Sequence, residues 1–271
     1  MNKYVAAVIL YHPDKEVFAR IDRYSKIFDK VIVYDNTENP EYHTENSDKI
    51  TYLGRNKNDG LPYAYNKILK YIFDNYSFDY MCMLDQDSEY SNTAIKNIIN
   101  FIENSKMKNV AIYGPAIKYR YHTTLTKNKY EIVSWVITSG CFVNLKIIKD
   151  NGLSFDENYF IDRFEVDMCK QLTNLNYKIV QVNSSILKQE LGEDSGHRHP
   201  NHSPIRHYYL ARNRLYFNKK YYGFLKRWLL NILQSGRHIV LIALYENNKA
   251  SKIKHCLKGW NDYSKSKFKK A

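Results

Sequence analysis

The chain has 271 residues, of which 44% are hydrophobic, and its 41 Lys and Arg against 28 Asp and Glu give a formal net charge of +13. This length and composition suit one large domain, or one domain with an appendage. The four cysteines form no C-x-x-C pair, which argues against a zinc ribbon or a redox motif. The longest apolar stretch is broken by polar residues, which argues against a membrane-spanning helix.

Strand and helix signals alternate through the first third of the chain. Short apolar runs predict strands at 5–12, 31–35, 50–54 and 78–85, and the run at 31–35 is rich in β-branched residues. Helical periodicity predicts helices over 13–28 and 61–73. This alternation indicates an α/β fold with a mixed, mostly parallel sheet flanked by helices, and ligands of such sheets bind at the carboxyl ends of the strands.

The middle of the chain is less regular. We predict strands at 110–117 and 177–190, and over 131–148 a strand, a Ser-Gly turn and then a second strand or the start of a helix. Residues 155–172 begin as a loop and become a helix. The polar, turn-rich residues 192–206 predict a mobile loop.

We expect the main domain at 1–215 and a basic helical extension at 216–271. Residues 219–271 hold 13 Lys and Arg against 2 Asp and Glu, a net charge of +11. Apolar residues recur beside cations, as is typical of a helix at a membrane interface: Phe224, Trp228, Leu229, Ile232 and Leu233, with Lys226 and Arg227. Nucleic acid or an anionic membrane would suit this extension; a solvated tail, or a helix packed on the main domain, is the alternative.

Two carboxylates, Asp85 and Asp87, directly follow the predicted strand 78–85 in the stretch MCMLDQDS. On an extended strand, residues 85 and 87 face the same side, where both can bind one hard cation such as Mg²⁺ or Mn²⁺. The alternative is an ordinary polar strand end, because many surface turns contain D-x-D. Asp35 also ends a predicted strand, so we expect it at the same edge of the sheet.

Five stretches of this chain occur in the order found in family 2 glycosyltransferases of the GT-A fold, and they resemble that family's motifs: VIVYDN (31–36), NDGLPYAYN (58–66), LDQDS (84–88), TSG (138–140) and FDENYFIDRFEVD (155–167). The similarity covers roughly residues 4–215. Within the family, YHP (11–13), LDQDS, FIDRFEVD and HSPIRHYYLARN (202–213) look most like bacterial rhamnosyltransferases.

The resemblance implies an inverting, metal-dependent enzyme. It would transfer a sugar, best guessed as L-rhamnose from dTDP-L-rhamnose, to a hydroxyl of a saccharide acceptor in bacterial cell-surface polysaccharide synthesis. A UDP-hexose donor is the alternative. The acceptor would be lipid-linked in one version of this hypothesis, with the enzyme in the cytoplasm and in peripheral contact with the inner face of the cell membrane.

The resemblance also implies a donor site. The nucleotide sugar would contact Asp35, Asn58, Gly60, Asn66, Asp85, Gln86, Arg206 and Arg212. Asp35 would accept the imide N–H of uracil or thymine, although it can equally cap a turn. Asp87 would be the direct ligand of Mg²⁺ or Mn²⁺, with Asp85 facing the ribose or a metal-bound water. The two arginines would hold diphosphate oxygens, or else lie on an exposed helix face.

An acceptor site is implied over Ser139, Gly140 and Asp162. Glu165 would be the general base, at a position where relatives commonly carry Asp, with Asp167 orienting it or replacing it in that role. The alternative for this acidic cluster is electrostatic, because acids favour the N-terminus of a helix.

A histidine that helps to bind the metal in relatives is replaced here by Gln189. His197, His199 or His202 could substitute for it, or water alone could complete the metal shell.

Two rivals remain from other classes of protein. A basic, non-catalytic nucleic-acid-binding protein would explain the charge but not the carboxylates at strand ends. A sugar nucleotidyltransferase would need an early glycine-rich phosphate loop, and residues 5–20 contain no glycine.

Overall fold

The computed structural model describes residues 2–40, 45–87, 89–119, 122–189, 201–268 and 270. Its internal contacts divide the chain into two compact units, Met1–Asp156 with Glu165–Gln189 and Glu157–Phe164 with Glu190–Ala271. We call them the sheet unit and the helical unit. The division predicted after residue 215 falls inside one helix, α6 (Pro204–Tyr221), which belongs wholly to the helical unit.

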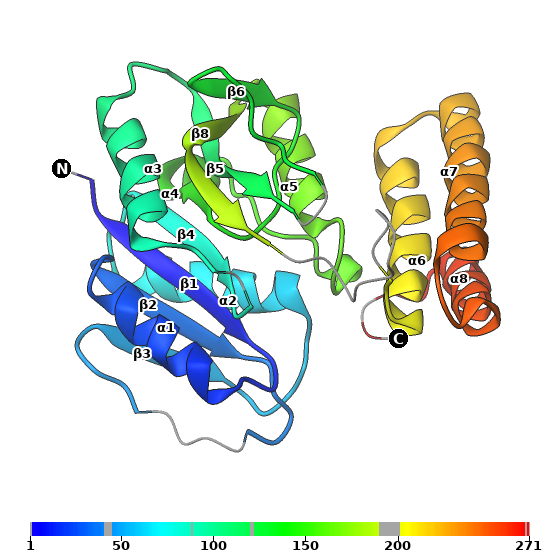
Figure 1. Ribbon diagram of the computed structural model, residues 1–271, viewed down its shortest axis with the longest axis horizontal. Helices are drawn as coiled ribbons and strands as arrows, with labels where there is room; N and C mark the ends of the chain where they lie inside the picture. The colour runs from blue at the N-terminus through cyan, green and yellow to red at the C-terminus, as the bar shows by residue number, and fades with distance from the viewer. Residues whose placement is uncertain are drawn as a thin grey trace. The chain divides into compact units, whose positions relative to one another are not determined.

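The sheet unit is built on an eight-stranded sheet in the order β3-β2-β1-β4-β7-β5-β8-β6 (Figure 1). The strands are β1 (Tyr4–Leu10), β2 (Lys30–Asp35), β3 (Ile50–Gly54), β4 (Tyr80–Asp85), β5 (Val110–Lys118), β6 (Tyr130–Val133), β7 (Cys141–Asn144) and β8 (Lys178–Lys188). The first four pair in parallel, as do β5 and β8, whereas β7 is antiparallel to β4 and β5, and β6 is antiparallel to β8. The predicted mixed, mostly parallel sheet is therefore confirmed.

Helices cover both faces of the parallel half of the sheet. They are α1 (Lys15–Ser25), α2 (Leu61–Asn75) and α3 (Asn92–Asn104), with α1 and α3 on one face and α2 on the other (Figure 1). Every residue of β1 is buried, as expected for a strand covered on both faces. The chain also forms α4 (Leu145–Asp150), a 3-10 turn η1 (Glu157–Tyr159) and α5 (Phe164–Asn174).

α3 is an element that the sequence analysis missed. Its signal was present, because Ser91 caps the helix by accepting a hydrogen bond from the backbone N–H of Ala94. Ile95, Ile98 and Ile102 then recur at helical spacing and are buried against the sheet.

The helical unit contains α6, α7 (Phe224–Tyr245) and α8 (Lys249–Ser264). α8 packs so closely on α6 that a Cβ atom at Gly259 would lie 2.5 Å from the carbonyl oxygen of Tyr208. α8 is thus part of this unit's core and not a free tail. None of the helices in the described part of the chain combines the length and apolar character needed to cross a bilayer.

A chain of buried polar side chains joins the three helices. His207 of α6 is hydrogen-bonded through Nδ1 to Nε2 of His238 on α7, at 2.8 Å, and through Nε2 to Oε2 of Glu246, also at 2.8 Å. Lys252 of α8 donates to the same Glu246 oxygen at 2.8 Å. Burial raises the pKa of Glu246, but the bonds from Lys252 and His207 outweigh it and lower the pKa to about 2.

Burial, helped by the nearby Arg214 cation, also lowers the pKa of His238 to about 3. Both groups therefore bind protons less readily in the folded state than in the unfolded state. The stability due to His238 is complete above its unfolded pKa of about 6.5 and is lost as the pH falls towards 3. That due to Glu246 is lost as the pH falls from about 4.5 to 2.

We predict that the melting temperature of the helical unit falls steadily between pH 6.5 and 4. In the variant His238→Gln, which keeps an N–H donor but cannot titrate, that fall should shrink to roughly half of the wild-type value. Circular dichroism melts across this pH range measure it, with the exposed His12→Gln as the control variant. Equal pH slopes in His238→Gln and wild type would contradict the role of His238.

Candidate functional site

Two carboxylates lie at the carboxyl edge of the parallel strands. Asp35 is the last residue of β2 and Asp85 the last residue of β4. In the strand register, Asp35 is opposite Leu10 and Asp85 opposite Ile9 of β1, which runs between them. The expectation that Asp35 and Asp85 share one edge is confirmed, and we call this edge the carboxylate rim.

The turn after β4 is held by the side chain of Gln86. Its Oε1 accepts from the backbone N–H of Tyr11 at 2.8 Å, and its Nε2 donates to the carbonyl of Tyr11 at 2.9 Å. Arg20 also donates to the carbonyl of Gln86 at 2.7 Å. The sequence predicts Gln86 as a contact of the nucleotide sugar, but its amide is engaged by backbone instead. Its contacts fix the turn on which Asp87 stands exposed.

Ser139 and Gly140 lie beside the end of β4, and Ser139 is hydrogen-bonded to it. Ser139 is fully buried, and its Oγ accepts from the backbone N–H of Asp85 at 3.3 Å. Gly140 has a φ of +78°, and a Cβ atom there would lie 2.9 Å from Cγ of Pro115, so only glycine fits. The predicted role of these two residues in holding the acceptor does not match their burial, because neither presents a side chain at the surface.

The start of α2 is tied to the end of β2. Asn36 donates to the carbonyl of Gly60 at 3.3 Å, and the side-chain oxygen of Asn58 accepts from the N–H of Gly60 at 3.1 Å. Asp35 itself accepts from the backbone N–H of Thr37 at 2.8 Å, which is the turn-capping bond considered as its alternative role. These bonds bring the first turn of α2 to the carboxylate rim.

The sequence predicts Asn66 as a contact of the nucleotide sugar, but its side chain is bonded to backbone instead. Its amide forms two reciprocal hydrogen bonds of 2.9 Å with the backbone of Phe155, one to the carbonyl and one from the N–H. Asn66 therefore anchors the segment that leads towards α5.

Glu165 and Asp167 lie in the first turn of α5, but their surroundings differ. Asp167 is fully buried and accepts from the side chain of Gln171 at 2.8 Å. Glu165 is half-buried and lines a small cavity of about 10 Å³ together with Phe155 and Cys169. Burial, with a smaller contribution from the Glu165 carboxylate, raises the pKa of Cys169 to about 12, so this thiol is no nucleophile.

The remaining predicted residues belong to the helical unit. Arg206 contacts Asp162, with 3.2 Å between Nη2 and Oδ1. Arg212 is fully buried and donates to the carbonyls of Asn158 and Tyr159, at 3.0 Å each. The sequence predicts that Arg212 holds diphosphate oxygens or else lies on an exposed helix face. The structure matches neither prediction, because the guanidinium is buried and bonded to backbone.

Asn213 is a residue that the sequence analysis overlooked. Its side-chain amide donates to the carbonyls of Tyr159, Ile161 and Asp162, at 3.0, 2.6 and 3.0 Å. Three non-glycine residues of this segment have positive φ, namely Phe160 (64°), Asp162 (59°) and Arg163 (70°). Such backbone is strained by about 1–3 kcal/mol per residue, and strained segments of this kind concentrate at functional sites.

The sequence offers Gln189, a loop histidine or water to complete the metal shell. Gln189 follows β8 and its backbone N–H donates to Lys118 at 3.2 Å. His197 and His199, like most of the predicted 192–206 loop, lie outside the described residues, and His202 belongs to the helical unit. The rim carboxylates are oxygen donors suited to Mg²⁺ or Mn²⁺, and substrate phosphates and water commonly fill the rest of such a shell.

One other group of potential metal ligands occurs among the described residues, His207, His238 and Cys256 of the helical unit. Both ring nitrogens of His207 are already engaged, by His238 and by Glu246. Cys256 lies 4.0 Å from Nδ1 of His238. A continuous hydrogen-bond chain accounts for this group without a metal.

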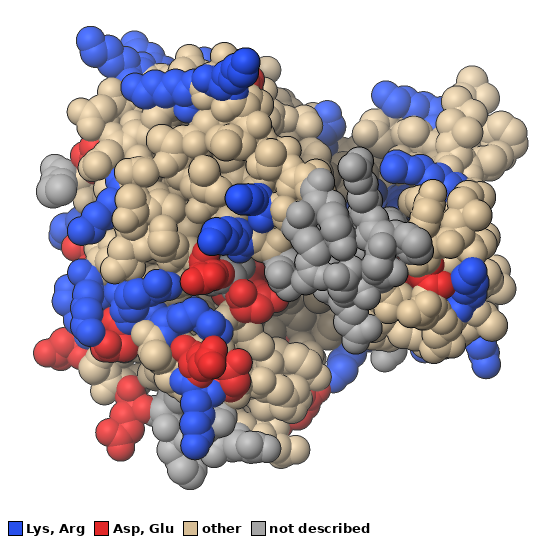
Figure 2. Space-filling model, viewed as in Figure 1, with Lys and Arg blue, Asp and Glu red and all other residues tan. Residues whose placement is uncertain are grey.

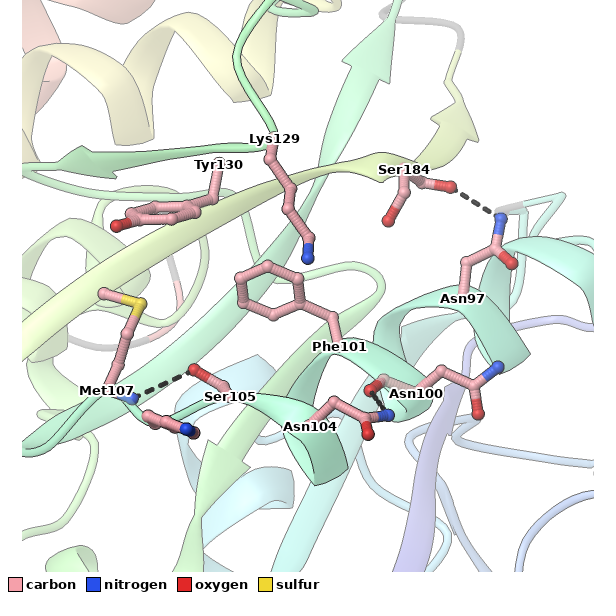
Figure 3. Close-up of a pocket in the computed structure, with 10 residues that line it drawn as sticks. Asn97, Asn100, Phe101, Asn104, Ser105, Met107, Lys129, Tyr130 and Ser184 are labelled. Carbon is pink, nitrogen blue, oxygen red and sulfur yellow. Dashed lines mark hydrogen bonds between the residues drawn. The ribbon is translucent and has the colours of Figure 1, made fainter.

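A cavity of about 730 Å³ opens between α3 and the β6–β8 edge of the sheet. Figure 3 shows its aromatic side chains, Phe101 and Tyr130, with the amine of Lys129 above the Phe101 ring, 5.8 Å from its centre. None of the residues lining this cavity is a predicted site residue, so it is separate from the carboxylate rim.

Comparisons with known proteins agree with this architecture. The mannosyltransferase PcManGT from Pyrobaculum calidifontis, in complex with GDP-Man and Mn²⁺, superposes with a TM-score of 0.56 at 9% identity, over 98% of this chain and 83% of that one. TarS 1–349 of S. aureus in complex with UDP-GlcNAc gives 0.52 at 15% identity, over 97% and 73%. GalNAc-T7 with UDP, GalNAc and Mn²⁺ gives 0.54 at 10% identity, over 70% of this chain and 44% of that one. At these identities the similarity is one of fold.

Sequence relatives point the same way. Residues 27–150 match the model of glycosyl transferase family 2. The dTDP-rhamnosyl transferase RfbF of Shigella flexneri is 25% identical, over 94% of this chain and 93% of that protein. The predicted resemblance to rhamnosyltransferase-like glycosyltransferases of family 2 is thereby confirmed, and the similarity of fold to solved glycosyltransferases agrees with it.

Proposed function

We propose that this glycosyltransferase transfers L-rhamnose from dTDP-L-rhamnose to a saccharide hydroxyl, with inversion and with the aid of a divalent cation. The observation that carries the proposal is the carboxylate rim, where Asp35 and Asp85 flank β1 and the Gln86 turn presents Asp87 beside them. The similarity to the dTDP-rhamnosyl transferase RfbF supports rhamnose as the sugar. A UDP-hexose is the alternative donor.

Asp87 and Asp85 would hold Mg²⁺ or Mn²⁺ together with the donor diphosphate. When bound, the cation neutralises the charge that develops on the departing nucleoside diphosphate. Asp35 would accept the imide N–H of thymine through the oxygen not used by Thr37. Asn58 and Gly60 would place the first turn of α2, and its positive helix end, near the nucleotide.

Glu165 would act as the general base. It removes the proton from the acceptor hydroxyl as that oxygen attacks the anomeric carbon; the bond to the diphosphate oxygen breaks with its electron pair, and the configuration inverts. Glu165 is half-buried whereas Asp167 is fully buried and bonded to Gln171, which supports Glu165 as base and Asp167 as a residue that positions the helix turn. Asp162 would contact the acceptor, assisted by Arg206.

The acceptor in this proposal is part of a bacterial cell-surface polysaccharide, carried on a lipid. The enzyme would then work in the cytoplasm, in peripheral contact with the inner face of the cell membrane. Binding to nucleic acid is the rival explanation of the basic charge, but it gives no reason for carboxylates at the ends of the two strands that flank β1.

The donor is tested by a thermal-shift panel of sugar nucleotides with and without Mn²⁺. We expect dTDP-L-rhamnose with Mn²⁺ to raise the melting temperature more than UDP-hexoses do, because a ligand that binds only the folded state stabilises it. A larger shift with a UDP-hexose would replace the proposed donor. If every sugar nucleotide leaves the melting temperature unchanged while nucleic acid raises it, the rival function is favoured.

The metal role is tested by Asp87→Ala. We expect kcat to fall by about 10²-fold or more, with a weaker dependence on Mn²⁺ concentration. The reason is that the cation which holds the donor diphosphate loses a protein ligand. Asp22→Ala, which removes an exposed carboxylate of α1 paired with Lys26, is the control and should keep wild-type kcat. Wild-type kcat in Asp87→Ala would remove Asp87 from the site.

The base is tested by two amide substitutions. Glu165→Gln should leave the donor affinity unchanged and lower kcat by ~10²-fold or more, because the amide cannot take the proton. Asp167→Asn should lower kcat less. If the larger loss occurs in Asp167→Asn and Glu165→Gln retains most of the activity, the two roles are exchanged.

A further inference from the structure

The α7 helix exposes an apolar side, whereas an ordinary helix of a soluble protein buries its apolar side and exposes its polar side. Its large apolar side chains on one face are 50% to 79% exposed: Leu225, Leu229, Ile232, Leu233, Val240 and Leu244. Their spacing of three, four and seven residues places them along one side of the helix. We call this side the outer face of α7.

The uncharged polar residues Asn231 and Gln234 of α7 face into the helical unit instead. Asn218 of α6 donates to the side-chain oxygens of Asn231 and Gln234, at 2.8 and 3.1 Å. His238 is buried against His207. In a helix that meets water on its outside, this arrangement would be reversed, so the outer face is suited to an apolar surrounding.

Charge distinguishes two surroundings for the outer face, namely a second copy of this chain and an anionic lipid surface. Residues 219–271 carry a net charge of +11, and Lys226 and Arg237 of α7 are exposed together with its apolar stripe. A second copy packed face to face would bring two strongly basic segments together, which costs electrostatic energy. An anionic lipid surface complements that charge and also accepts the apolar side chains.

The visible side of the helical unit is consistent with this charge distribution. Figure 2 shows Lys and Arg side chains over α6–α8, with wide areas that are neither acidic nor basic along the α7 edge. α7 has 22 residues, which corresponds to a length of about 33 Å. It is not apolar enough to cross a bilayer, so it would lie along the surface.

We propose that the outer face of α7 is a membrane-binding surface. The helix lies in the interfacial plane of an anionic bilayer, with the leucine stripe among the upper acyl chains and Lys226 and Arg237 at the lipid phosphates. This inference rests on the membrane contact of the proposed function and assigns that contact to a surface. It places the contact on α7 and not on α8, because α8 is packed on α6 and Lys252 is buried against Glu246.

Vesicle co-sedimentation of the full chain tests the assignment. Wild type should bind vesicles of phosphatidylcholine with phosphatidylglycerol, bind pure phosphatidylcholine at least tenfold more weakly, and lose affinity as NaCl is raised. The variant Leu229→Gln/Leu233→Gln should bind the anionic vesicles at least tenfold more weakly than wild type. The matched control is Leu175→Gln/Leu257→Gln, which changes two leucines that are also exposed but lie just after α5 and on α8, and it should bind as wild type does.

A second measurement needs no change to the leucines. Trp228 lies on α7 and is 59% exposed, so its fluorescence should shift to the blue and be quenched by brominated lipids when vesicles bind. In Trp228→Phe, the quenched component should disappear, because Trp135 and Trp260 lie outside α7. Quenching that persists in Trp228→Phe would place the membrane contact elsewhere.

The possible outcomes distinguish a failure of the membrane-binding assignment from a failure of the proposed transfer reaction. If wild type fails to bind anionic vesicles, or if light scattering shows a dimer that Leu229→Gln/Leu233→Gln converts to a monomer, the membrane assignment is overturned. Transfer to a soluble acceptor saccharide should be the same in wild type and in the leucine variant. Loss of vesicle binding with unchanged transfer supports the surface, whereas a wild type that transfers no sugar contradicts the proposed function and leaves vesicle binding as a separate result.

Discussion

The parallel pairing of β4 with β1, closed at its end by the amide of Gln86, is the constraint on which the candidate site depends. The pairing brings Asp35 and Asp85 to one edge, and the two bonds between Gln86 and the backbone of Tyr11 fix the turn that carries Asp87. Each such bond contributes about 0.5–1.5 kcal/mol net. Their larger effect is on geometry, because carboxylates that share one cation must be held close against their own repulsion.

The same design recurs in both units of the chain. Ser139 holds the N–H of Asp85, Asn66 holds the backbone of Phe155, and Asn213 holds three carbonyls of the strained 159–162 segment. These polar side chains satisfy backbone groups that would otherwise be buried without partners, which costs about 1–3 kcal/mol each. Positioning is therefore assigned to amides and hydroxyls, and the proposed chemistry is left to the carboxylates Asp35, Asp85, Asp87 and Glu165.

The sequence predicts the strands and the carboxylate rim well, because both depend on local patterns: 50–54 coincides with β3, and a strand ending at Asp85 follows from its apolar run. It does not predict the partners of Gln86, Asn66 or Arg212, since those lie 75, 89 and 54 residues away along the chain. The sequence predicts an amphipathic helix at 224–233, but it does not distinguish a membrane interface from packing on the main domain, because which face is exposed depends on α6 and α8.

The most direct test of the central claim is whether the rim binds a cation together with a nucleoside diphosphate. Electron paramagnetic resonance of free Mn²⁺ measures this on the intact chain without any acceptor. We predict that the protein alone depletes the free Mn²⁺ signal weakly. Protein and dTDP together should deplete that signal at least tenfold more strongly than the two do separately. The double variant Asp85→Asn/Asp87→Asn should abolish this synergy. Depletion that is merely additive, or that is unchanged in the double variant, would contradict the account.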